Sequence, residues 1–161
     1  MPRTARPEAY DVRSLLSHRL LVLSNTLGKG AVRLYAQRFG VPLAEWRLLA
    51  ALVVNAPASV NALAAALSTD KGWISRTTAS LVDKGLAATR PDPSDARSFQ
   101  IVLTPAGRAL HKRILPAALE RQRKLLEAFS DKELATLDEL LTRLQKQAEL
   151  LADRMDIKEV A

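Results

Sequence analysis

The fold is decided by residues 59–104, which read SVNALAAALSTDKGWISRTTASLVDKGLAATRPDPSDARSFQIVLT. Ser59 is a good N-cap for an alanine-rich helix over residues 60–67, and the S-T-D triplet that follows offers cap side chains for a second helix over residues 71–84. Gly85 stands where a left-handed residue usually ends a helix. The spacing therefore predicts two short helices that meet at a three-residue turn.

A hairpin is predicted directly after this helix pair. Residues 86–90 and 98–103 have the composition of strands, and the second run alternates apolar and polar side chains. The stretch between them, residues 91–97 (PDPSDAR), consists of turn-forming residues. We therefore expect a two-stranded hairpin with a long tip.

Long amphipathic helices are predicted on both sides of this segment. Apolar residues recur at alternating steps of four and three from Leu16 to Leu34, and a shorter helix follows Pro42. A further helix begins at an N-cap, Thr104, followed by Pro105. Residues 130–133 (SDKE) form a capping box for the last helix, which repeats leucines from Leu134 to Leu151 with the period of a two-helix seam. A chain of 161 residues is too small to cover all these faces, so we expect the terminal helices to pair with a second copy.

The order of these elements predicts a mainly α fold. It is a winged helix-turn-helix with a two-stranded wing and N- and C-terminal dimerisation helices. We expect a single domain over residues 1–161, in which 10–40 and 105–153 form the helical dimerisation region and 43–104 form the winged-helix lobe. In such a lobe the second helix of the pair fits the major groove, while the hairpin lies against the flanking DNA.

The composition argues against several classes of protein. The absence of cysteine excludes disulfides, thiolate metal sites, cysteine nucleophiles and thiol redox sensors. His18 and His111 have neither metal-binding nor catalytic spacing, and no phosphate-binding loop or nucleophile elbow is present, so we expect no enzyme, cofactor or metal site. Without a signal peptide or a membrane-spanning run, the chain is expected to be a soluble cytoplasmic protein with no membrane partner.

The charge favours an anionic partner but is unevenly distributed. The net charge is +7, yet residues 68–100 carry five basic and four acidic side chains. Residues 1–40 carry seven basic against two acidic, and residues 101–124 carry six against one. Phosphate attraction is therefore expected to come largely from these two segments, with plain solvated helix faces as the alternative explanation.

Three motifs occur in a specific order and spacing: LVDKGL at residues 81–86, Asp95-Ala96-Arg97, and VLTPAG at residues 102–107. They resemble the end of the recognition helix, the D-x-R wing signature and the L-T-x-x-G start of the fifth helix in the MarR family of transcription regulators. The resemblance covers nearly the whole chain, although the terminal helices match in position and length rather than in motif. It implies a homodimer that binds a pseudo-palindromic operator in double-stranded DNA, as a repressor. The alternative is a winged-helix module that binds a protein partner.

The second short helix is expected to carry the base contact. At about 100° per residue, Ile74, Thr78, Leu81 and Val82 share the core face, and Arg76 lies opposite Ile74. A guanidinium can donate two parallel hydrogen bonds to O6 and N7 of a guanine, so Arg76 is the best candidate for a base contact. The alternative is that Arg76 forms a surface salt bridge with Asp70 or Asp83. The other expected DNA contacts in and before this helix are Thr69, Lys71, Trp73, Ser75, Thr77 and Ser80. Trp73 could instead fold back on the preceding helix, and capping or solvation could explain some hydroxyl groups.

In the wing, the expected contacts are Arg90, Ser94, Asp95 and Arg97. The resemblance implies that Arg97 reaches the minor groove and that Asp95 holds it or neighbouring basic groups in place. Arg90 is expected to sit across the hairpin and bind phosphate. A narrow minor groove concentrates negative potential, which favours A·T-rich flanks. The alternative is an ordinary turn with an ion pair of little energetic value.

A small-molecule effector is also implied by the resemblance. MarR-like proteins commonly release DNA when a small phenolic or carboxylate compound enters the crevice between the dimerisation helices and the DNA-binding lobe. By position, the candidates for such a site are Tyr35, Trp46, Arg47 and His111. Trp46 occupies a helical stripe position, where a tryptophan is more often part of the core.

Overall fold

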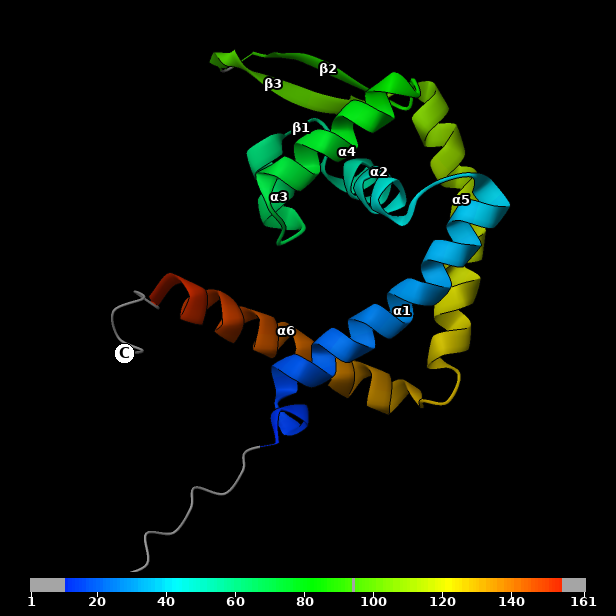
Figure 1. The fold of residues 1–161 in the computed structure, drawn as a ribbon, viewed down its shortest axis with the longest axis vertical. Coiled ribbons are helices and arrows are strands. Elements are labelled where there is room, and N and C mark those ends of the chain that lie inside the picture. The colour runs from blue at the N-terminus through cyan, green and yellow to red at the C-terminus, as the bar shows by residue number, and fades with distance from the viewer. Residues whose placement is uncertain (1–10, 94, 155–161) are drawn as a thin grey trace, which may run out of the picture. The chain divides into compact units, whose positions relative to one another are not determined.

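The computed structural model describes residues 11–93 and 95–154, and within these it leaves out the side chains of 95–97 and 153–154. The fold is mainly helical with one three-stranded antiparallel sheet (Figure 1), in agreement with the predicted class. The chain divides into two compact units between Ile114 and Leu115, and each is considered by itself.

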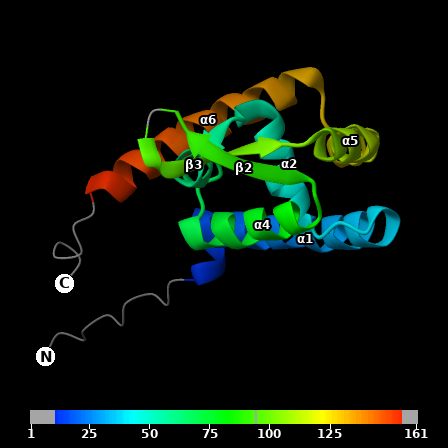
Figure 2. The same cartoon turned by 90° about the horizontal axis from the view of Figure 1, so that it is seen from above.

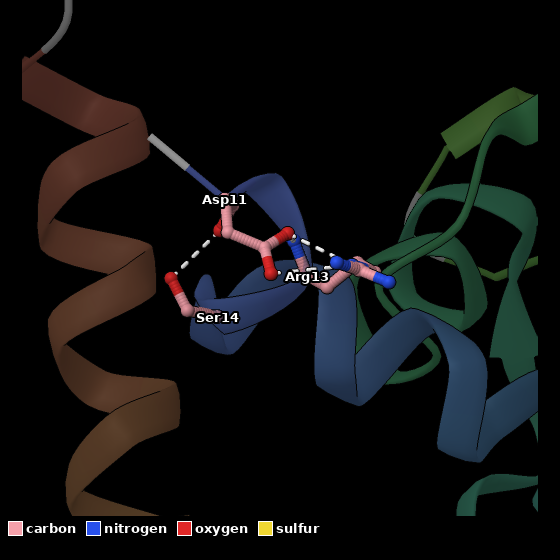
Figure 3. A network of polar contacts seen from close by, with 3 residues as sticks. All are labelled: Asp11, Arg13 and Ser14. Carbon is pink, nitrogen blue, oxygen red and sulfur yellow. Dashed lines mark hydrogen bonds and ion pairs between the residues drawn. The ribbon is translucent and has the colours of Figure 1, made fainter. Parts of the chain in front are cut away.

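The first unit begins with a short capped turn before its long helix. A 3-10 turn, η1 (Val12–Ser14), precedes α1 (Leu16–Phe39). The Asp11 carboxylate accepts hydrogen bonds from the Arg13 backbone N–H at 3.0 Å and from Arg13 Nε at 2.9 Å, as Figure 3 shows. The Arg13 side chain thereby lowers the pKa of Asp11. At the other end, α1 stops at Gly40, whose φ of 68° is the left-handed conformation of a helix C-cap.

Three shorter helices follow: α2 (Leu43–Asn55), α3 (Val60–Ala66) and α4 (Lys71–Asp83). The predicted caps of the helix pair are confirmed, because Ser59 Oγ accepts from the Ala62 N–H at 3.2 Å and Asp70 Oδ1 accepts from the Trp73 N–H at 2.7 Å. Gly85 has the predicted left-handed φ, 67°. Helix α4 contacts both α2 and α3, so the two helices before it support the one that carries Arg76.

The sheet contains one strand more than the sequence predicted. Strand β1 (Ala58–Ser59) pairs with β3 (Asp95–Leu103), which pairs with β2 (Ala87–Asp92), so the order is β1-β3-β2. The hairpin strands extend further than expected, and the predicted long tip is wrong. Pro91 does not interrupt β2, because β2 is an edge strand and proline is tolerated there. Figure 2 shows the resulting hairpin beside α4, which contacts β2.

The core of the first unit lies between these short elements. The fully buried side chains are Leu48, Leu49, Leu52, Leu63, Ile74, Leu81, Ile101 and Ile114. One part of the predicted core is wrong: Val82 is 39% exposed, while Thr77 is only 7% exposed. Thr77 lies three residues after Ile74 and four before Leu81, so the buried stripe of α4 is centred closer to Thr77 than predicted.

Helix α5 (Pro105–Leu126) begins in the first unit and ends in the second. Thr104 caps it as predicted, since its Oγ accepts from the Gly107 N–H at 3.0 Å, and the same hydroxyl donates to the Gly85 carbonyl at 2.7 Å. Helix α5 continues through Pro116 as one element. Thr104 therefore ties the start of α5 to Gly85, just after the end of α4.

The second unit contains the rest of α5 and helix α6 (Asp131–Arg154). The capping box predicted at Ser130 is confirmed. The Ser130 N–H donates to Glu133 Oε2 at 2.8 Å, and the Glu133 N–H donates to Ser130 Oγ at 3.4 Å. The apolar stripe of α6 remains exposed at Leu137, Leu140, Leu141, Leu150 and Leu151.

Candidate nucleic-acid interface

Helix α4 has one buried and one exposed face. Ile74, Thr77, Thr78 and Leu81 are buried, whereas Lys71, Ser75 and Arg76 are exposed. Arg76 therefore lies on the face opposite Ile74, as predicted. Its guanidinium lies over Gly72, where a Cβ atom would meet Arg76 Nη1 and Asp70 Oδ1, each at 3.0 Å. Among the ion pairs of the described residues, none joins Arg76 to Asp70 or Asp83.

Two hydroxyl groups on α4 are not placed as the sequence predicted. Thr77 is buried in the core, so its assignment as a DNA contact is wrong for this structure. Ser80 is half-buried, and its hydroxyl donates to Glu45 Oε1 on α2 at 2.7 Å. This proton is therefore used within the protein rather than being available to a phosphate. The buried face of α4 is therefore broader than a stripe of apolar residues indicates.

The start of α4 borders a pocket. Thr69 and Trp73 are half-buried and line a pocket of about 500 Å³ together with Trp46, Arg47, Ala50, Ala51 and Leu67. Trp73 therefore borders a pocket whose other residues belong mostly to α2 rather than to the preceding helix α3, and its DNA contact stays a prediction. Lys71 and Ser75 in the same two turns remain exposed to solvent.

One of the DNA contacts predicted in the hairpin has a described, exposed side chain. Arg90 is exposed, and its Nη2 donates to Gln100 Oε1 on the neighbouring strand at 3.2 Å. Ser94 lies outside the described residues, and so do the side chains of Asp95 and Arg97, whose backbones begin β3. Their roles stay predictions from the D-x-R motif.

A buried carboxylate on α2 was missed by the sequence analysis. Glu45 is 5% exposed, and its Oε1 accepts from Ser80 Oγ at 2.7 Å and from Lys84 Nζ at 2.5 Å. Glu45 is spaced from Leu48, Leu49 and Leu52 so that it lies on the buried face of α2. This helical spacing is the signal in the sequence that could have identified Glu45 as buried.

Three of the four predicted effector-site residues form an aromatic stack. The ring centroids of Tyr35 and Trp46 lie 5.4 Å apart, and those of Trp46 and His111 lie 5.3 Å apart with planes inclined by 15°. Tyr35 and Trp46 are 3% and 8% exposed, so the alternative that Trp46 belongs to the core is confirmed. Burial lowers the pKa of the His111 imidazole. The stack joins α1, α2 and the first half of α5.

Arg47, the fourth predicted residue, is exposed instead. It lines the pocket beside Trp73 and also an open groove of about 500 Å³ between α1 and α2. The other residues of that groove are Ser24, Asn25, Gly28, Lys29, Val32, Arg33 and Leu43. Arg47 and Trp46 thus border a space able to hold a small molecule.

Neither a metal centre nor a membrane segment was found in the described part of the chain. Over residues 11–93 and 95–154, no cluster of three or more histidine, aspartate or glutamate side chains could hold a metal ion. Within the same residues, no helix has the length and apolar character needed to cross a bilayer.

Comparison with known proteins places this geometry in a family. Residues 39–98 match the MarR family. A proposed transcriptional regulatory protein for the hcr operon of Thauera aromatica is 32% identical over 108 residues, which cover 67% of this chain and 65% of that protein. The uncharacterized HTH-type transcriptional regulator YxaD of Bacillus subtilis is 34% identical over 102 residues, covering 63% of this chain and 71% of that protein.

A solved structure agrees over almost the whole fold. The crystal structure of a MarR/EmrR family transcriptional regulator from Acinetobacter sp. ADP1 superposes with a TM-score of 0.82 at 28% identity, covering 88% of this chain and 99% of that one. The matched segment contains both helices of the helix-turn-helix pair and most of the wing. The chain therefore belongs to the MarR family of winged helix-turn-helix, DNA-binding transcription regulators.

Proposed function

We propose that the protein is a homodimeric transcriptional repressor that binds a pseudo-palindromic operator and is released by a small aromatic or phenolic effector. In each half-site, α4 enters the major groove and the β2–β3 wing lies on the adjacent minor groove. Its place of action would be the cytoplasm, where a bacterial operator is found.

The observation that carries this proposal is the two-sided character of α4. Its buried face is fixed on α2 and α3, while Arg76 and Lys71 extend from the exposed face. An exposed arginine at the centre of a supported helix is suited to a bidentate contact with guanine. The exposed basic side chains of α1 and α5, including Arg19, Lys112 and Arg113, would add phosphate contacts that the nearly neutral wing and α4 segment lack.

The exposed apolar faces of the terminal helices support the dimer. In α1, Leu16, Leu20 and Leu23 are exposed, and α6 exposes its leucine stripe. Contiguous apolar faces of this kind mark interaction surfaces in soluble proteins. A second copy offers the same faces, and a closed two-fold dimer would bury them on both chains.

The test is a titration of the DNA upstream of the protein's own gene. Wild-type protein should bind this fragment more tightly than random DNA, with affinity that falls as salt rises, and should protect two segments about 10 bp apart. Arg76→Ala should reduce the specific affinity by about 1–3 kcal/mol if it grips a guanine. Arg143→Ala, an exposed arginine of α6, is the matched control. No preference over random DNA, or protection of a single segment, would contradict the proposal.

For the effector, the pocket beside α4 is the best-supported position. Its volume lies in the range of small-molecule sites, Trp46 and Trp73 offer aromatic surface, and Arg47 can pair with a carboxylate. Salicylate should raise the melting temperature of wild-type protein and weaken DNA binding, and Arg47→Ala should reduce both effects. Arg33→Ala, which changes the α1–α2 groove alone, is the control. A shift lost in the Arg33 variant but kept in the Arg47 variant would move the effector to that groove.

A further inference from the structure

We infer that Glu45 of α2 is a positioning residue for DNA recognition, which holds the recognition helix α4 in its reading orientation through Lys84 and Ser80. The inference rests on the proposed role of α4 in operator binding. In it, Lys84 acts as an anchor within the protein and not as a phosphate contact.

The contacts join two helices that are distant in sequence. A single oxygen, Glu45 Oε1, accepts from Ser80 Oγ at 2.7 Å and from Lys84 Nζ at 2.5 Å. Ser80 and Lys84 are separated by one helical turn, so two positions at the end of α4 are attached to one point on α2. These contacts restrain α4 against rotation about its axis.

This restraint bears directly on Arg76. Ser80 follows Arg76 by four residues, so the two side chains leave neighbouring parts of the helix surface. A rotation of α4 that breaks the bond from Ser80 to Glu45 would also turn Arg76 away from its base. Recognition groups need to be held within about 10–20° of their productive orientation. The apolar side chains of α4 hold it by close packing, and the polar contacts add bonds that depend on orientation.

The two partners of the ion pair differ in exposure. The Glu45 side chain is 6% exposed and the Lys84 side chain is 42% exposed. The second oxygen, Glu45 Oε2, is buried and has no hydrogen-bond partner in the described residues. A carboxylate in this position depends on Lys84 for charge compensation, while Lys84 can turn to water. A buried carboxylate with one unpaired oxygen contributes unfavourably to the stability of the fold. Its presence is consistent with a role in setting the orientation of α4.

Two substitutions separate the parts of this contact. Glu45→Gln has nearly the same shape and keeps an acceptor for Ser80, but it removes the charge that holds Lys84. Lys84→Met keeps most of the apolar stem and leaves Glu45 buried without a cation. We therefore expect Lys84→Met to destabilise the fold more than Glu45→Gln does.

The experiment measures affinity for the operator fragment and for random DNA, the salt dependence of binding, and urea unfolding, for both variants and the double variant. Glu45→Gln should weaken operator binding by about tenfold and random-DNA binding by less than about twofold. The double variant should bind the operator no more weakly than Lys84→Met does, because both single changes break the same contact between Glu45 and Lys84. Glu139→Gln, which removes an exposed ion pair with Arg143 on α6, is the matched control and should leave binding unchanged.

The salt dependence distinguishes positioning from direct contact. If Lys84 binds a phosphate, Lys84→Met lowers the slope of log K against log salt by about one, and the inference is overturned. An unchanged slope with reduced operator affinity supports it. Equal losses on operator and random DNA, or additive losses in the double variant, would also overturn it. If Lys84→Met does not fold, Ser80→Ala supplies the second partner, with the same expected preference for loss on the operator. Failure of the wild-type protein to select the operator would count against the proposed function itself.

Discussion

Gly107 on α5 packs so closely on the backbone of Leu86 that a Cβ atom at position 107 would overlap the Leu86 carbonyl oxygen. That oxygen is held in place, because it accepts the Thr104 N–H at 3.2 Å. Gly107→Ala should therefore destabilise the first unit by roughly 1–3 kcal/mol, as overpacking typically does. Urea unfolding measures the change. Gly28→Ala in α1 is the control, since nothing lies within 4 Å of its added methyl group, and it should be neutral or stabilising.

The cap of the recognition helix is a second measurable element. Asp70 Oδ1 accepts the Trp73 N–H at 2.7 Å, and replacing an N-cap aspartate by alanine costs about 1 kcal/mol. Asp70→Ala should show this loss in urea unfolding, whereas Asp70→Asn should retain most of the stability because its side-chain oxygen can still accept. Equal stability of all three proteins would mean that the cap contributes nothing to the fold.

For the wing, the expected result concerns affinity rather than stability. If Arg97 enters the minor groove, Arg97→Ala should weaken binding most on operators with A·T-rich flanks, where the groove is narrow. Fluorescence anisotropy on paired operators with A·T-rich and G·C-rich flanks would measure this difference, and a melting curve would report folding. The same loss on both flanks would assign Arg97 to phosphate contact. An unchanged affinity would remove it from the interface.

The pH dependence of stability should contain a contribution from His111. Burial lowers the pKa of this imidazole in the folded state below the ordinary value of 6.5, so the folded protein favours the neutral ring. The contribution is present above that ordinary value and is lost as the pH falls through the folded-state pKa, because the unfolded chain binds the proton more readily. Wild-type protein should therefore lose more stability on acidification than His111→Gln. Parallel urea-unfolding series at stepped pH values would test this, and coincident profiles would contradict it.

Local signals in the sequence predicted the elements that they specify directly. The caps at Ser59, Asp70, Thr104 and Ser130 and the left-handed Gly85 were all predicted, because each depends on a few neighbouring residues. Strand β1 was missed, since two residues carry no periodicity and Ala58 becomes a strand only by pairing with Ile101. Its existence depends on a partner more than forty residues later in the chain.

The candidate site was predicted less completely for a related reason. A helical wheel assigns polar residues to solvent, and this assumption placed Thr77 and Ser80 on the DNA side. The same assumption overlooks the buried Glu45. In the structure Ser80 is bound to the Glu45 carboxylate, a contact across 35 positions that no local pattern indicates. Arg76, by contrast, was placed correctly because its position follows from the helical period alone.

Ser59 contributes to two elements at once. Its hydroxyl caps α3, while its backbone pairs with Gln100 in β3. The helix-turn-helix pair and the base of the wing are consequently joined at Ser59, where α3 begins. Helix α4 also contacts β2, so the spacing between α4 and the wing is set by packing within the first unit. If α4 reads the major groove and the wing the adjacent minor groove, as proposed, an operator with one base pair inserted between the two contacts should be bound more weakly, because the DNA would have to distort to restore the spacing.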